Sequence, residues 1–159
     1  ARSVNPRAIV VRGASPIVLD DPGAVRHRTV LVIEDGPSLT HGGLPHGAGY
    51  VAATRAGAAR VVDPRRFAAP AMAQIFRQYP HIGAVLPALG YSAAQREAMK
   101  ATIDASDAEV IVAATPADLS SLVGPDRRIV RARYEFAEAG GHLLEGELER
   151  FLRRAGLIA

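Results

Sequence analysis

The sequence predicts an α/β fold in which a mainly parallel sheet carries helices on both faces. Two observations support this prediction: short apolar runs rich in Val and Ile recur along the chain, and helical patterns lie between them. Continuous apolar runs are typical of strands that are buried on both faces of a parallel sheet. Alternation of strands and helices over short connections indicates a doubly wound, Rossmann-like sheet with right-handed crossovers.

Six apolar runs are expected to be strands, the first of them separated from the rest. They are residues 8–12, 29–34, 60–62, 82–86, 109–114 and 128–132. Residues 13–28 contain Gly, two Pro and two adjacent Asp and show little periodicity. We interpret residues 1–12 as a remnant strand of a preceding domain, residues 13–28 as a linker, and residues 29–159 as one α/β domain.

Helices are expected between these strands. Met72, Ile75, Phe76 and Tyr79 recur at helical spacing. Ser92 and Gln95 have the spacing of a capping box, and Thr115 before Pro116 has the pattern of another helix start. Near the end of the chain, Leu144, Leu148, Phe151 and Leu152 give a final helix one apolar face.

The amino-acid composition excludes several kinds of site and partner. The 159 residues are 48% apolar and 22% charged, as in an ordinary globular domain, and the absence of cysteine excludes disulfides and thiolate metal sites. Lys100 is the sole lysine among 19 basic residues, the arginines are dispersed, and only 5% of residues are aromatic, a poor pattern for nucleic-acid binding. No apolar run has the length of a membrane span or a signal peptide, so a cytoplasmic location without a membrane partner is expected.

Ligands of open α/β sheets bind beyond the carboxyl ends of the strands, which places the chemistry in loops. The four candidate loops are residues 35–49, 63–66, 87–91 and 115–119. The first loop is the richest in functional groups: it contains Gly36, Gly42, Gly43, Gly47 and Gly49, with Ser38, Thr40, His41 and His46 between them. Free glycine N–H groups, hydroxyls and the start of a helix after Pro45 predict a cradle for a phosphate or carboxylate. A flexible crossover whose glycines serve packing is the alternative.

Three side chains have specific candidate roles. His41 is the candidate catalytic acid or base, or else hydrogen-bonds only its own loop. Asp35 holds Mg²⁺ through water or orients a hydroxyl, or forms a turn with the residues after it. Arg65 reaches a substrate phosphate, or pairs with Asp63.

Other catalytic signatures are absent. The sequence contains no G-x-x-x-x-G-K-[ST] phosphate loop and no G-x-S-x-G nucleophile elbow, and Lys100 falls within a predicted helix. The chain alone is therefore not expected to hydrolyse nucleoside triphosphates.

Five strings carry a specific family resemblance that extends over nearly the whole chain. They are D-G-P-S-L-T-H-G (35–42), G-A-G (47–49), V-D-P-R (62–65), Y-P-H-I-G (79–83) and L-P-A-L-G-Y (86–91). With them the sequence resembles the C-terminal portion of the cyclic 2,3-diphosphoglycerate synthetase family, also described as predicted P-loop GTPases. Ser38 replaces a more usual Thr, and Leu44 and His46 also depart from the family pattern.

The resemblance implies a nucleotide-dependent enzyme. Family members are longer, and in the characterised activity ATP drives closure of an intramolecular phosphoanhydride. The resemblance places an NTPase core with the P-loop upstream, which would bind most of the ATP or GTP with Mg²⁺. This chain would bind a small phosphorylated substrate through Ser38, Thr40, Gly42, Gly43, Gly47, Gly49 and Arg65. A stand-alone module that senses a phosphorylated ligand, and a structural domain that forms homo-oligomers, remain alternatives.

Overall fold

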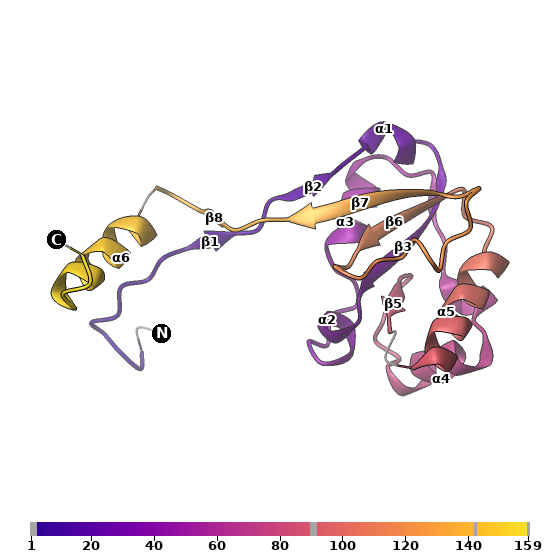
Figure 1. Cartoon of the computed structure of the whole chain (residues 1–159), viewed down its shortest axis with the longest axis horizontal. Coiled ribbons are helices and arrows are strands. Elements are labelled where there is room, and N and C mark those ends of the chain that lie inside the picture. Colours follow the sequence, from indigo (N-terminus) through magenta and orange to yellow (C-terminus); the bar gives the residue numbers. More distant parts are fainter. Residues whose placement is uncertain (1–2, 90–91, 142, 159) are drawn as a thin grey trace. The chain divides into compact units, whose positions relative to one another are not determined.

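The computed structural model describes residues 3–89, 92–141 and 143–158, and the chain divides into two compact units (Figure 1). The sheet unit comprises residues 17–133, and the terminal unit comprises residues 1–16 and 134–159. Residues 90–91, part of the third expected loop, lie outside the described residues.

The described residues of the sheet unit form a mostly parallel sheet. Its strands, in spatial order, are β2 (Ile17–Leu19), β7 (Arg128–Tyr134), β6 (Val110–Ala114), β3 (Thr29–Asp35) and β4 (Arg60–Val61), with β5 (Leu86–Ala88) also paired to β3. β3 pairs in parallel with β4, β5 and β6, and β6 pairs in parallel with β7. The predicted α/β class with a mainly parallel, Rossmann-like sheet is confirmed.

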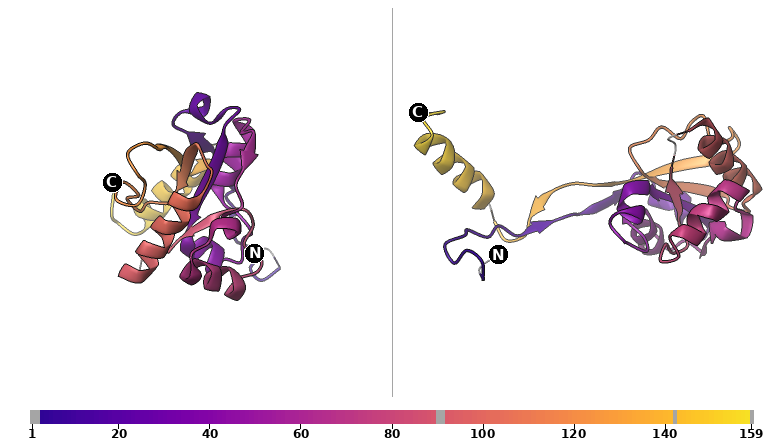
Figure 2. Two further views of the ribbon diagram at one scale, coloured as in Figure 1. Left: turned by 90° about the vertical axis from the view of Figure 1, so that its right-hand side faces the viewer. Right: turned by 90° about the horizontal axis from the view of Figure 1, so that it is seen from below.

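Helices cover both faces of this sheet. They are α1 (Pro22–Val25), α2 (Gly36–Thr40), α3 (Ala48–Arg55), the 3₁₀ helix η1 (Pro64–Phe67), α4 (Pro70–Gln78) and α5 (Ala93–Ala105). α3 packs on one face against β3 and β6, and α4 with α5 lies on the other face (Figure 2). Residues 30–33 of β3 are fully buried from both sides, as their continuous apolar run predicts. The predicted capping box at Ser92 and Gln95 is present.

Several segments differ from expectation because local polar groups decide their structure. Residues 8–12 form no strand. Residues 17–28, expected to be linker, form β2 and α1: the Asp20 N–H donates to the Arg131 carbonyl (2.9 Å), and the Asp21 carboxylate caps α1 (3.0 Å). The helix expected after Thr115 is absent, because the Thr115 and Asp118 side chains accept from backbone N–H groups two residues ahead and favour turns.

The strand expected at residues 82–86 begins only at Leu86. β5 starts at Leu86 because the backbone before it is bonded elsewhere: the Gly83 N–H donates to the Pro45 carbonyl (2.6 Å), and Arg65 donates to the carbonyls of Ile82 and Gly83. Those groups are therefore not available to the sheet.

The terminal unit is built from short elements. β1 (Gly13–Ala14) pairs antiparallel with β8 (Ala137–Glu138), and α6 (Leu143–Arg154) follows. The predicted last helix is confirmed, but Leu144, Leu148 and Phe151 are exposed, Leu152 is half-buried, and none of the described residues of this unit is buried. No helix in the described part of the chain is long and apolar enough to cross a membrane.

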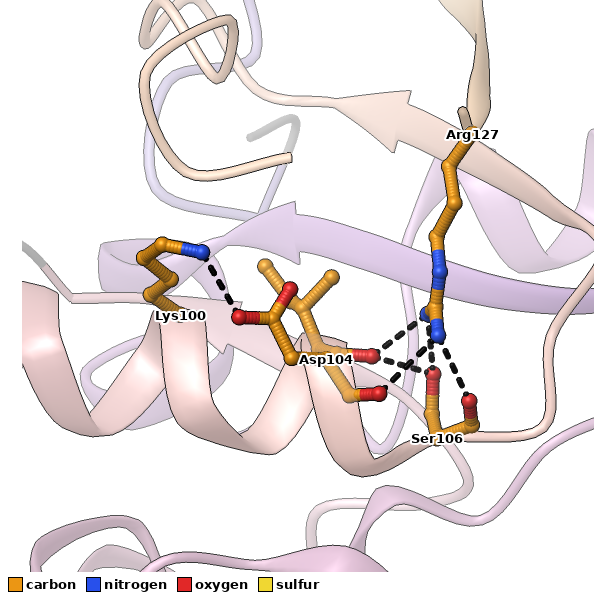
Figure 3. Close-up of polar contacts among 5 residues, drawn as sticks. Lys100, Asp104, Ser106 and Arg127 are labelled. Carbon is orange, nitrogen blue, oxygen red and sulfur yellow. Dashed lines mark hydrogen bonds and ion pairs between the residues drawn. The ribbon is translucent and has the colours of Figure 1, made fainter. Parts of the chain in front are cut away.

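One arginine closes the carboxyl end of α5 (Figure 3). The Arg127 guanidinium donates to the carbonyls of Ile103 (2.5 Å), Asp104 (3.0 Å) and Ser106 (2.9 Å), and to the Ser106 hydroxyl (2.9 Å). The last carbonyls of a helix lack intrahelical partners, and a cation there also interacts favourably with the helix dipole. Arg127 therefore joins the start of β7 to the end of α5.

Replacing Arg127 by Ala should lower the free energy of unfolding by about 1.5–3 kcal/mol, because half-buried carbonyls lose a charged donor. Urea unfolding of the whole chain measures the change. Arg55→Ala, which removes an exposed arginine from the last turn of α3, is the matched control and should change stability little. Equal losses in the two variants would show that the hydrogen bonds of Arg127 contribute no special stabilisation.

Candidate functional site

The strand order reverses between β3 and β6, and open α/β sheets have their binding crevice at such a point, here named the β3–β6 crevice. The chain passes through β4 and β5 on one side of β3 and then crosses to β6 on the other side. A reversal of this kind leaves an opening beyond the carboxyl ends of the two strands, where open α/β sheets bind their ligands. Asp35 ends β3 at this edge, and Thr115 follows β6. The first and fourth predicted loops therefore meet the crevice.

Glu34, which the sequence analysis did not single out, lies at the centre of this edge. Its side chain is buried, with only 3% exposed. Oε1 accepts from the N–H groups of Gly47 (3.0 Å) and Tyr50 (2.9 Å) at the start of α3. Glu34 falls within an apolar strand pattern, and a buried acid opposite a glycine-rich helix start is the signal that could have identified it.

The helix start predicted to hold a substrate anion is therefore occupied by a carboxylate of the chain itself. Gly47 and Gly49 are needed for that contact, since a Cβ on Gly47 would come within 2.6 Å of Glu34 Oε2. A Cβ on Gly49 would come within 2.8 Å of Ala114 and 2.9 Å of Val32. The structure thus gives these two glycines a packing role beneath the loop.

Burial raises the pKa of Glu34 above the ordinary glutamate value. The N–H groups of Tyr50, Gly47 and Gly49 oppose that shift, as does the nearby His46 imidazole, because all four favour the charged carboxylate. The His46 ring also lies 4.5 Å from the ring of Tyr50, centroid to centroid.

The predicted polar residues of α2 cluster at the crevice. The Ser38 hydroxyl donates to Asp35 Oδ2 (3.1 Å), and the Thr40 hydroxyl donates to the Gly36 carbonyl (3.0 Å). Thr40 Oγ1 also lies 2.9 Å from His41 Nδ1. In the tautomer that carries the proton on Nδ1, His41 donates to Thr40 Oγ1, and Nε2 of this exposed histidine can accept a proton.

The remaining glycines of the loop have different environments. The Gly42 N–H donates to the Pro37 carbonyl (3.1 Å) and so closes α2. Gly43 has a φ of +66° with open space around it, so a glycine suits this exposed turn. His81, from the segment after α4, donates from Nε2 to the Leu39 carbonyl (2.8 Å) and fixes α2 from the other side.

Arg65 does not point into the crevice as a free cation. Its guanidinium donates to the Gly83 carbonyl (2.9 Å), the Ile82 carbonyl and Asp63 Oδ1 (3.2 Å), and it stacks 4.8 Å from the Phe76 ring centre. The expectation that Arg65 is spare for a phosphate conflicts with these contacts, because each bond would be lost on reorientation. Arg65 holds the segment before β5 in place.

A cavity of about 330 Å³ lies along β7, between Asp20 and Asp21 on one side and the loop after β6 on the other, and it reaches Ala113 of β6. Its lining includes Ala113, Asp118, Leu119, Ser120, Arg128 and Arg131. The pKa of Asp118 is lowered by hydrogen bonds from the backbone and hydroxyl of Ser120, which hold it as a carboxylate. Ala113 pairs with Ile33 of β3 and Arg131 of β7, so Arg131 lies on the same sheet face as Asp35.

Metal binding by this part of the chain alone has weak geometric support. Among the described residues no three His, Asp or Glu side chains gather as a metal site. Asp35 uses Oδ2 for Ser38, which leaves Oδ1 as one candidate ligand atom. A Mg²⁺ ion at Asp35 would need most of its ligands from water, nucleotide or another domain.

Replacing Glu34 by Gln should abolish the pH dependence of the free energy of unfolding that arises from the Glu34 carboxyl group. The Gln side chain keeps one oxygen that can accept hydrogen bonds from the start of α3. The folded state binds the Glu34 proton more tightly than the unfolded state, because the folded pKa is raised. That stabilisation is complete below the ordinary glutamate pKa of 4.5 and is lost as the pH rises through the raised pKa. The free energy of unfolding of the wild type minus that of Glu34→Gln should fall across this window and be constant above it.

Urea unfolding at a series of pH values between about 4 and 8 measures this difference. Glu97→Gln, at an exposed position of α5, is the control and should show no such fall. A flat difference for Glu34→Gln would mean that burial does not perturb this carboxyl group.

The comparisons with known proteins give one informative match. The chain is 43% identical over 150 residues to arginine synthetase ArcE of Thermococcus kodakarensis. The alignment covers 94% of this chain and 34% of the relative, so the chain spans about a third of the length of the curated relative. No protein-family model matches the chain, and no solved structure matches it. The chain is thus similar, nearly throughout, to one part of a larger synthetase.

Proposed function

We propose that this chain is one domain of a nucleotide-dependent ligase. The observation that carries the proposal is the 43% identity to a synthetase over nearly the whole chain. The topology supports it, because the β3–β6 crevice is the position at which α/β enzymes hold small substrates. The similarity to the cyclic 2,3-diphosphoglycerate synthetase family leads to the same reaction class, in which nucleotide cleavage drives bond formation.

In this proposal another domain of the same protein binds most of the ATP or GTP and its Mg²⁺. The sequence has no P-loop motif, and its sole lysine is engaged in an ion pair with Asp104 on α5 (2.6 Å), as Figure 3 shows. The relative is about three times as long as the matched region, which leaves room for a P-loop domain. The domain described here supplies the substrate side of the site.

His41 is the proposed acid–base group and Asp35 the group that orients the substrate. The Thr40 contact fixes the His41 ring with Nε2 open to accept a proton, and its exposure allows a substrate to reach it. Asp35 is held by Ser38 in one orientation, so its second oxygen can accept a hydrogen bond from a substrate nitrogen or hydroxyl. Metal-assisted binding at Asp35 would use the same oxygen.

The proposed substrate is an amino acid of the arginine type. The relative is named for arginine synthesis, and the cavity along β7 is lined by carboxylates and by the Arg131 guanidinium, groups that suit a zwitterion with a nitrogen-rich side chain. A small phosphorylated metabolite is the second candidate. It is favoured by the Thr40–His41 pair and the exposed Gly43 backbone, but Arg65 is already bonded and Glu34 occupies the start of α3.

A hybrid protein tests this proposal. In it, this chain replaces the 150 matched residues of the Thermococcus arginine synthetase, and arginine formation is followed with ATP and with GTP. The hybrid should form arginine, whereas the 159-residue chain alone should hydrolyse neither nucleotide. Asp35→Asn in the hybrid should lower turnover about ten- to a hundredfold, the effect of one lost charge-assisted hydrogen bond.

Asp126→Asn, at an exposed position before β7, is the matched control and should leave turnover unchanged. Calorimetric titration of the chain with arginine and with 2,3-diphosphoglycerate separates the two substrate classes. Nucleotide hydrolysis by the isolated chain, or full activity of Asp35→Asn, would contradict the proposal.

A further inference from the structure

The terminal unit exposes most of the large apolar side chains that reach solvent. Thirteen such side chains are exposed in the described residues, and all but Val18 and Leu44 belong to the terminal unit, which leaves eleven there. In the sheet unit, by contrast, a buried cluster takes up the apolar residues of the strands and helices. Exposed apolar side chains that lie side by side indicate an interaction site.

α6 contributes one apolar face to these exposed residues. Leu144, Leu148 and Phe151 follow one another at helical spacing, with 43%, 53% and 57% of their surfaces exposed. Glu149 and Arg153 lie on the opposite face. This pattern is typical of an amphipathic helix whose apolar side packs against another protein surface.

The contacts within the terminal unit are too weak to stabilise α6 without a partner on its apolar face. α6 has 12 residues, and isolated helices shorter than about 12–15 residues are marginal in water. Its local support includes surface contacts: Glu138 accepts from the Leu144 N–H, and Arg150 pairs with Glu147 and donates to the Gly146 carbonyl (3.1 Å). Exposed ion pairs contribute little, and the β1–β8 ladder is only two residues long on each strand.

We infer that the apolar face of the terminal unit, formed by Leu144, Leu148 and Phe151 of α6, docks on the remaining part of the same polypeptide. This inference rests on the proposed function, and the occupant is the nucleotide-binding domain of the ligase. The alignment leaves about two-thirds of the relative outside the matched region, enough chain for a further domain.

The chemistry of α6 specifies the surface that receives it. An apolar groove takes the leucines and Phe151, as in helix-in-groove recognition. Charged residues surround the apolar stripe, with Glu145, Glu147 and Glu149 in the first half and Arg150, Arg153 and Arg154 in the second. A rim of mixed charge around an apolar centre is the ordinary anatomy of a protein–protein interface. A covalently linked partner also has a millimolar effective concentration, an advantage that a second copy lacks.

Hydrogen exchange of the free chain and of the hybrid protein tests this inference. In the free chain, the α6 amides should exchange rapidly while those of β3 and β6 remain protected, which shows that the sheet unit is folded. In the hybrid, the α6 amides should exchange at least about a hundredfold more slowly. Light scattering of the free chain should give a monomer at micromolar concentration.

Paired variants identify the face that docks. Leu148→Gln with Phe151→Gln should remove the protection of α6 in the hybrid, whereas the control, Glu149→Gln with Arg153→Gln on the opposite face, should keep it. Protection of α6 in the free chain through a dimer, or equal exchange in the free chain and the hybrid, would overturn the inference. Protection in a hybrid that forms no arginine would contradict the proposed function and leave this docking surface intact.

Discussion

The structure depends most on the contact between the Glu34 carboxylate and the start of α3. A buried carboxylate is costly unless hydrogen-bond donors surround it, and here the N–H groups of Gly47 and Tyr50 supply them. The same donors would otherwise be unsatisfied at the helix start. The contact therefore joins the carboxyl end of β3 to the helix that follows the glycine-rich loop, and it sets where that loop begins and ends.

With both ends of the loop held, the side-chain atoms without a partner in the loop are the ones to which we assign the proposed chemistry. His41 and Asp35 retain one unused nitrogen and one unused oxygen at the β3–β6 crevice, whereas Glu34 and Arg65 are consumed in holding the structure. This division is consistent with the proposal that the chain acts together with a separate nucleotide-binding domain. In that proposal, the exposed apolar residues of α6 form the surface on which such a domain docks.

Much of the fold could be predicted from sequence because apolar periodicity reports burial directly: β3, β6, α4 and the capping box of α5 lie where their patterns place them. Local side chain–backbone bonds are not visible in such patterns, so the turns at Thr115 and Asp118 replaced an expected helix. The glycine-rich pattern predicts a helix start that binds a substrate anion, whereas the chain's own Glu34 carboxylate lies there, because the strand brings it beside Gly47. The bonds of Arg65 to Ile82 and Gly83 depend in the same way on contacts distant in sequence.

The ionisation of Glu34 followed by nuclear magnetic resonance tests the central claim most directly. With ¹³C-labelled glutamate and ¹⁵N-labelled backbone, the Glu34 carboxyl carbon and the Gly47 and Tyr50 amides can be titrated in one sample. We expect all three signals to move with one common midpoint, above the ordinary glutamate pKa. A Glu34 carboxyl that titrates without moving these two amides, or at the ordinary value, would contradict the claim that this contact organises the loop.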